Sequence, residues 1–119
     1  MSNVFTATKR VVGALVLAVH ICPATAQTVP AIYRASVIFA SCQSDNAADR
    51  ARCEGFVAGT FSTLADPVLS RVAICPPESS DIVQLVLVTQ KYMREHPEIL
   101  HYSASGVVAA ALKTAFPCR

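Results

Sequence analysis

The cysteines of this 119-residue chain constrain its fold more than any other feature. One of the five, Cys22, lies in an N-terminal apolar stretch, and Cys42, Cys53, Cys75 and Cys118 are spread over the rest of the chain. Four cysteines in a small exported protein are typical of two disulfides. A hydrophobic core of this size supplies little net stability, so such covalent links would matter for folding.

The first 26 residues predict export by a cleaved signal peptide. A positively charged region ends with Lys9-Arg10, an apolar run covers residues 11–22, and an A-x-A motif occupies residues 24–26. The run is too short to cross a bilayer, which takes about 20 apolar residues, so we expect no stable membrane insertion. We expect residues 1–26 to be removed and residues 27–119 to form one domain.

Two other interpretations of this N-terminal stretch are weaker. Cys22 would be a candidate for lipidation, but the bulky Ile21 occupies a position where a small residue is needed. An ordinary buried helix does not explain charges followed directly by an apolar run and an A-x-A motif. The signal peptide therefore remains the preferred interpretation.

The charge of the remaining chain excludes several classes of partner. Lys9 and Arg10 account for the whole formal net charge of +2, so residues 27–119 are neutral. A neutral chain without a basic stripe has no electrostatic basis for binding nucleic acid or an anionic membrane. We expect neither partner.

Capping residues, prolines and helical spacing of apolar residues predict about four helices. Residues 82–89 are rich in β-branched side chains and resemble a strand by composition, but the helical pattern continues through residues 90–95. The expected fold is therefore all-α, a small bundle held by disulfides. The predicted helices start at Thr28-Val29-Pro30, at Ser44 or Asp45, at Ser79 or Ser80, and at Ser103, and they end near Cys42, at Asp66-Pro67, at His96-Pro97 and at Phe116-Pro117.

This order of elements favours one pairing of the cysteines. Cys42 ends the first predicted helix and Cys53 lies early in the second, so a bond between them would clamp that hairpin. Cys75 precedes the third helix and Cys118 follows the fourth, and these positions meet if the two helices are antiparallel. The two other pairings, which would tie one hairpin to the other, remain open.

A metal site is not expected. The cysteines contain no C-x-x-C pair, whereas zinc sites usually use closely spaced ligands. His96 and His101 are separated by Pro97 and do not share a helical face. Disulfides and ordinary loop histidines explain these residues.

The sequence also contains no recognisable catalytic frame. A cysteine nucleophile needs a free thiolate near a base, and all four cysteines beyond residue 27 can pair. Ser103, His101 and Glu98 can be arranged into a triad on paper. However, no G-x-S-x-G motif is present, and Ser103 is explained as a helix cap. We expect neither catalytic residues nor a cofactor.

Gly55 and Gly59 form a G-x-x-x-G motif within the second predicted helix. Each glycine costs up to about 1 kcal/mol of helix propensity relative to alanine, which suggests a packing role. The motif predicts that another helix approaches closely here. That helix belongs either to the same chain or to a second copy in a homodimer.

Several short motifs in a fixed order resemble the resistance-associated protein and type VI amidase immunity (Rap/Tai) family. Their order, above all H-P-E followed by a terminal A-F-P-C, carries the resemblance over residues 35–119. The motifs are Cys53–Gly59 (CEGFVAG), Cys75-Pro76-Pro77, Gln84-Leu85, Tyr92, His96-Pro97-Glu98 and Ala115-Phe116-Pro117-Cys118.

The resemblance implies a helical, disulfide-containing periplasmic protein, often dimeric, that binds a cell-wall amidase injected by type VI secretion. Inhibition of this kind is steric: a loop or helix end fills the amidase cleft. The family supplies no shared catalytic residues, and its toxin contacts vary with the toxin. We take exposed polar residues near helix ends as candidate contacts, namely Asp66, Arg71, Arg94, Glu95 and His101. The region from Asp66 to Ile74 is short and carries only two charges, which gives a partner little to hold.

Two other classes of function compete with this one. The same architecture, with titratable His96 and His101 and eight carboxylates, would suit a small periplasmic chaperone activated by acid. Such a protein would lose fixed structure below about pH 4, where carboxylates become protonated. A hydrolase would instead show turnover that disappears when a named serine or histidine is replaced.

Overall fold

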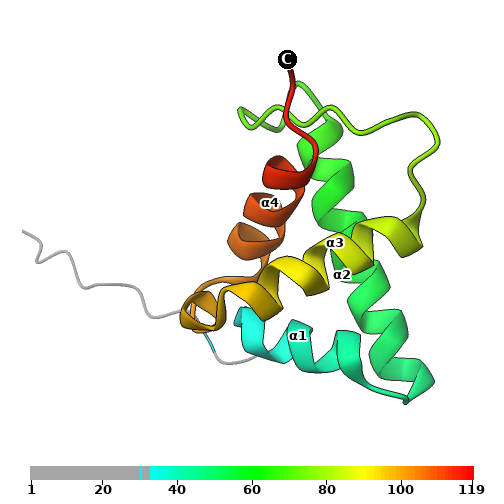
Figure 1. Ribbon diagram of the computed structural model, residues 1–119, viewed down its shortest axis with the longest axis vertical. Helices are drawn as coiled ribbons and strands as arrows, with labels where there is room; N and C mark the ends of the chain where they lie inside the picture. The colour runs from blue at the N-terminus through cyan, green and yellow to red at the C-terminus, as the bar shows by residue number, and fades with distance from the viewer. Residues whose placement is uncertain (1–29, 31–32) are drawn as a thin grey trace, which may run out of the picture.

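A computed structural model describes residue 30 and residues 33–119, and the predicted signal peptide, Cys22 and Thr28 lie outside the described residues. The described chain forms four α-helices, joined by connections that include the 3-10 helix Pro97–Ile99, with no strand, and this confirms the all-α prediction. Each α-helix packs against the other three (Figure 1). The elements are α1 (Ala35–Gln43), α2 (Ala47–Ala65), α3 (Ile82–Glu95), η2 (Pro97–Ile99) and α4 (Ala104–Ala115).

The start of α1 differs from the prediction because a tertiary contact determines it. The sequence predicted a helix from Thr28-Val29-Pro30, but Arg34 is extended and forms an isolated bridge with Ser103. The first amides of α1 have no side-chain cap. They donate instead to the turn before α4, from Ala35 to the carbonyl of Tyr102 and from Ser36 to that of Leu100, both at 2.9 Å.

The N-terminus of α2 is capped by Asn46 and not by Ser44 or Asp45 as predicted. The Asn46 side chain accepts hydrogen bonds from the amides of Ala48 (2.8 Å) and Asp49 (3.3 Å). Ser44 supports this cap, because its hydroxyl accepts from the Asn46 amide and donates to Asp49. The helix ends at Ala65, immediately before the predicted Asp66-Pro67 stop.

For α3, the structure confirms a helix and rules out the strand alternative. Its cap is Asp81, which accepts from the amide of Gln84 at 2.8 Å, so the predicted start at Ser79 or Ser80 is wrong by one or two residues. The helix ends before His96-Pro97, as predicted. Ser103 caps α4 by accepting from the amide of Gly106 at 3.4 Å, also as predicted.

The core lies where the four helices meet. Its buried apolar side chains include Ile38, Val57, Leu85, Met93 and Leu112, one or more from each helix. Fully burying a side chain of this size contributes roughly 1.5–3 kcal/mol. Among the described residues, the buried polar side chains are Ser41 and Thr89, so no ionisable group lies in the described core.

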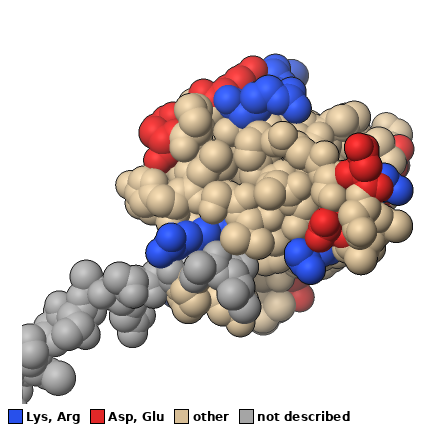
Figure 2. All heavy atoms as spheres, turned by 90° about the horizontal axis from the view of Figure 1, so that it is seen from below, with Lys and Arg blue, Asp and Glu red and all other residues tan. Residues whose placement is uncertain are grey.

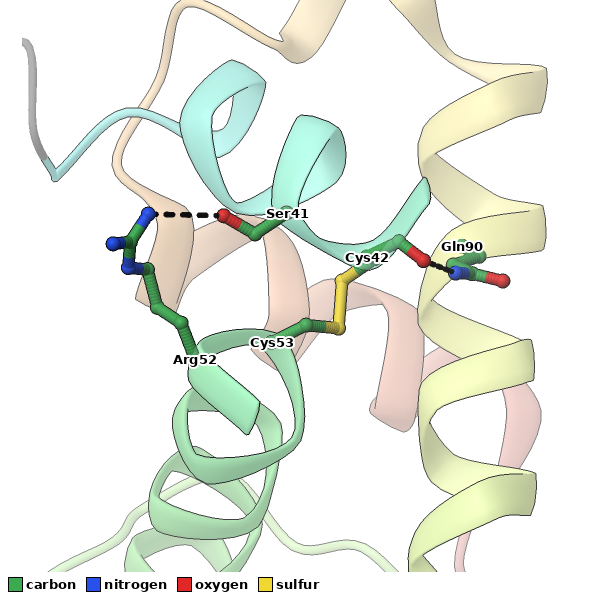
Figure 3. Close-up of a disulfide and its surroundings, with 5 residues drawn as sticks. All are labelled: Ser41, Cys42, Arg52, Cys53 and Gln90. Atoms are coloured by element: carbon green, nitrogen blue, oxygen red, sulfur yellow. Dashed lines mark hydrogen bonds between the residues drawn. A yellow bond between two sulfur atoms is a disulfide. The ribbon is translucent and has the colours of Figure 1, made fainter. Parts of the chain in front are cut away.

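Two disulfides link neighbouring elements in the pairing that the order of elements favoured. Cys42–Cys53 joins the end of α1 to α2 inside the core, where the side chain of Gln90 on α3 donates to the carbonyl of Cys42 (Figure 3). Cys75–Cys118 joins the connection between α2 and α3 to the segment after α4. Within the part of the chain that the structure describes, no helix is both long enough and apolar enough to cross a membrane.

Candidate functional site

The most exposed large hydrophobic side chains of the described residues are adjacent in sequence. Val68 is 89% exposed and Leu69 is 69% exposed, directly after the end of α2. Contiguous exposed apolar surface often marks an interaction site. We call residues 67–71 the apolar turn, and it is the candidate functional site.

Hydrogen bonds to side chains hold the apolar turn in one shape. The carboxylate of Asp66 accepts from the amides of Val68 (2.7 Å) and Leu69 (3.3 Å), and its carbonyl accepts from the amide of Ser70 (3.0 Å). Ser70 in turn bonds to both the amide and the carbonyl of Val72. A turn that is already ordered loses less conformational entropy when it binds.

The connection that carries the apolar turn is anchored farther along at Cys75. This residue is bonded to Cys118, and its amide donates to the carbonyl of Phe116 at 2.9 Å. Phe116 is buried and holds the end of α4 in the core. The apolar turn therefore projects from the end of the bundle where α4 finishes and the C-terminus lies (Figure 1).

The structure separates the five polar residues predicted as partner contacts into two groups. Asp66 directly precedes the apolar turn and Arg71 is its last residue, whereas Arg94, Glu95 and His101 lie around η2, before α4 begins. The length of α4, twelve residues or about 18 Å, separates the two groups. One protruding element cannot present both groups to the same narrow cleft.

These polar residues also differ in what they contact. Asp66 is half-buried and uses its carboxylate to brace the turn, while Arg71 is exposed. Glu95 lies 3.9 Å from the amine of Lys91, and the ring of His101 lies against that of Tyr102, with centroids 4.0 Å apart.

Val68 and Leu69 were missed at the level of sequence, where only polar residues were considered as contacts. The sequence did contain a signal for them. The aliphatic pair lies between Asp66-Pro67 and Ser70-Arg71, in a segment without helical periodicity.

Ser103, His101 and Glu98 do not form the catalytic triad that could be drawn from the sequence. The Ser103 hydroxyl caps α4 and lies 3.0 Å from the hydroxyl of Ser105. Glu98 pairs with His96, whose Nδ1 is 3.2 Å from the carboxylate. The pKa of Glu98 is lowered, first by a hydrogen bond with its own backbone and then by the His96 side chain.

No metal centre is found in the described portion of the chain. Residue 30 and residues 33–119 bring no three His, Cys, Asp or Glu side chains together in a way that could hold a metal ion. All four cysteines of this portion are in disulfides.

Gly55 and Gly59 do not mediate helix packing within the described chain. A Cβ atom added at either position would have no heavy atom within 4 Å, and both glycines are exposed. Of the two predicted alternatives, the described chain supplies no close helix of its own at this motif, and packing against a second copy stays a prediction. The glycines instead line a shallow apolar hollow of about 540 Å³ between α2 and α4, together with small residues of α4 such as Gly106 and Ala109.

Charged side chains form no broad patch of a single sign on the face seen in Figure 2. Blue and red groups lie beside one another around its edge, and its centre is uncharged. Two of the ion pairs in the described chain are of this exposed kind, Asp49–Arg52 at 3.2 Å and Lys91–Glu95 at 3.9 Å. Surface pairs of this type contribute about 0–1 kcal/mol each.

Comparison with known proteins identifies the family. Residues 21–118 match the family model of the Rap1a immunity proteins, which covers most of the chain and includes every described helix. No curated protein and no solved structure gave a match. The resemblance carried by the ordered motifs is thereby confirmed.

Proposed function

We propose that this chain, which belongs to the Rap1a immunity protein family, is a periplasmic inhibitor of a peptidoglycan amidase effector delivered by type VI secretion. The family match carries the proposal that the protein neutralises a toxin. The amidase as target, the secretion system and the periplasm come from the ordered motifs and from the predicted signal peptide of residues 1–26. In this proposal residues 27–119 form the working domain, and inhibition requires neither a cofactor nor catalysis.

The apolar turn is the element that we propose enters the effector. Val68 and Leu69 are the most exposed large apolar side chains described, and hydrogen bonds already fix their backbone. Burying two such side chains in an apolar pocket would stabilise a complex by roughly 1.5–3 kcal/mol each. A rigid turn in the cleft excludes the peptide substrate without any chemical step.

Polar residues have supporting roles in this proposal. Arg71 is the last residue of the apolar turn and is suited to pair with an acidic group at the rim of the cleft. Asp66 acts by holding the turn in shape. Arg94, Glu95 and His101 contact only an effector that reaches along α4 to η2, so their replacement is expected to have the smaller effect.

A homodimer formed through Gly55 and Gly59 is a second part of the proposal. The described chain places no atom against either glycine, and the adjoining hollow between α2 and α4 is apolar. A helix of a second copy can approach closely where side chains are this small. Gly59→Leu is therefore expected to convert a dimer into a monomer in sedimentation, whereas a monomeric wild-type protein would contradict this part.

The acid-activated chaperone has less support from the structure. Such a switch usually requires charged groups whose protonation breaks the native packing. Within the described residues the core contains no ionisable side chain, and the ion pairs lie on the surface. Unchanged far-ultraviolet circular dichroism and no new dye binding at pH 3 would argue against a chaperone.

Capture and inhibition test the proposed function. Oxidised protein beginning at Gln27 is immobilised at neutral pH and exposed to the amidases and secreted toxins of its own source. We expect one cell-wall amidase to be retained and its hydrolysis of peptidoglycan to stop at an equimolar ratio. A folded bait, verified by circular dichroism, that retains no hydrolase would overturn the proposal.

The location is tested separately. The exported protein is isolated and its N-terminus is determined by mass spectrometry. We expect Gln27 as the first residue in the periplasmic fraction. An intact Met1 or a lipid-modified Cys22 would contradict the proposed processing.

A further inference from the structure

The two disulfides differ in their access to solvent. Cys42 is 9% exposed and Cys53 is 1% exposed, whereas Cys75 and Cys118 are both exposed. Reduction of a disulfide begins with attack by a thiolate on one of its sulfur atoms, so access limits the rate. A reductant in solution therefore meets the Cys75–Cys118 bond first.

The exposed Cys75–Cys118 bond also attaches an irregular connection to the helical bundle. Residues 66–81 connect α2 to α3 without an α-helix, and Cys75 lies near the middle of this stretch. Its disulfide to Cys118 and its amide bond to Phe116 attach the connection to the end of α4. The Cys42–Cys53 bond instead lies among packed helices, beside Gln90 of α3.

We propose that Cys75–Cys118 is a redox-sensitive clasp for the apolar turn. A dithiol reductant opens this bond while Cys42–Cys53 and the four helices remain intact. Opening the clasp removes the covalent anchor on the C-terminal side of the apolar turn, leaves only the hydrogen bond from the amide of Cys75 to Phe116, and weakens the binding of the partner. The last step rests on the proposed function, whereas the selective opening does not.

The chemical step is ordinary thiol–disulfide exchange. One thiolate of the dithiol attacks a sulfur of the clasp, the S–S bond breaks, and the other cysteine leaves as a thiolate that takes up a proton. The second thiolate of the reductant then attacks the mixed disulfide and releases the remaining cysteine. Two electrons pass from the dithiol to the protein, and the reductant becomes a cyclic disulfide.

The first test measures the order of reduction in the wild-type protein. Oxidised protein is treated with dithiothreitol at neutral pH, sampled over time, alkylated and mapped by peptide mass spectrometry. We expect Cys75 and Cys118 to be alkylated at least tenfold faster than Cys42 and Cys53. Equal rates, or faster labelling of the buried pair, would overturn the proposal.

The second test uses trypsin, because Arg71 lies in the exposed connection and Arg52 lies in α2 as an internal control. Opening the clasp is expected to raise the rate of cleavage after Arg71 at least fivefold and to leave cleavage after Arg52 unchanged. The Cys75→Ser/Cys118→Ser variant should behave in the same way without reductant. A parallel rise at Arg52 in the partly reduced wild-type protein would indicate general unfolding and overturn the clasp.

The third test separates the clasp from the proposed function. If the oxidised protein captures an amidase, opening the clasp should weaken that binding at least tenfold, and unchanged affinity would overturn the regulatory role while leaving the inhibitor intact. If the oxidised protein captures no amidase, the proposed function fails, and the labelling and cleavage results still decide whether the clasp exists.

Discussion

The two disulfide-linked regions of this protein show how the same covalent bond serves different purposes. At Cys42–Cys53 the bond lies among side chains that already pack together, and Gln90 of the neighbouring helix α3 donates a hydrogen bond to the backbone carbonyl of Cys42. At Cys75–Cys118 the bond restrains a connection that has no α-helix of its own. The first region is ordered mainly by side-chain packing, and its disulfide adds to that order. The second depends on local hydrogen bonds and on its disulfide, which leaves its side chains free to meet a partner.

The largest expected effect comes from removing the buried bond. The Cys42→Ser/Cys53→Ser variant should lose about 4–6 kcal/mol of the free energy of unfolding, because loop closure supplies about 3 kcal/mol and poorly paired buried hydroxyls cost about 1–3 kcal/mol. Cys75→Ser/Cys118→Ser is the matched variant. It should lose about 4 kcal/mol or less, although its sequence separation is 43 instead of 11.

Urea denaturation of both double variants under the same conditions measures these losses. Chain entropy alone would make the exposed bond the more important one, because it closes the longer loop. A larger loss for Cys75→Ser/Cys118→Ser would therefore show that burial does not distinguish the two regions.

A smaller effect is expected at the two ends of α2. Asn46 and Asp66 each accept hydrogen bonds from two backbone amides, so Asn46→Ala and Asp66→Ala should each lower stability by about 1 kcal/mol. The two variants should differ in function. Asp66→Ala also loosens the apolar turn and should weaken partner binding, whereas Asn46→Ala should leave the affinity unchanged. Equal affinities in a titration would contradict the bracing role of Asp66.

The smallest expected effect is on the pH dependence of stability. It involves Glu98, which lies in neither disulfide-linked region. Because the pKa of Glu98 is lower in the folded protein, its contribution to stability is present above pH 4.5 and is lost as the pH falls through the folded value. Replacing the carboxylate in Glu98→Gln should remove this contribution. The wild-type protein should therefore have the higher unfolding midpoint at pH 6. The difference between the two midpoints should shrink at pH 3. A difference that grows at pH 3 would contradict the sign.

Much of the fold was predictable because local chemistry determines it. Prolines marked the ends of α2 and α3, and Ser103 was identified as the cap of α4 from its position alone. The start of α1 was not predictable in the same way. Its amides are satisfied by carbonyls of residues 100 and 102, far away in sequence. For α2 and α3, several polar residues compete for the cap, and only the backbone conformation decides among them.

The candidate site was harder to predict than the fold. Asp66 and Arg71 pointed to the segment after α2. The contact role was predicted for charged residues because the exposure of an aliphatic side chain in an irregular segment has no periodic signature. Val68 and Leu69 became candidates only when their exposure was known. The spacing of the G-x-x-x-G motif indicates a smooth helix face but does not say what covers it, so the sequence could not choose between a helix of the same chain and a helix of a second copy.

The most direct test of the account compares two exposed aliphatic pairs. Val83 and Leu87 on α3 are 60% and 59% exposed and provide a matched control for Val68 and Leu69. The affinity of the captured amidase is measured by calorimetry for Val68→Asp/Leu69→Asp, for Val83→Asp/Leu87→Asp and for the wild-type protein. We expect the first variant to bind at least 100-fold more weakly and the second to bind within about threefold of wild type. This corresponds to a difference of about 2 kcal/mol or more. Unchanged binding by the first variant, with loss of binding by the second, would contradict the assignment of the apolar turn as the inhibitory element.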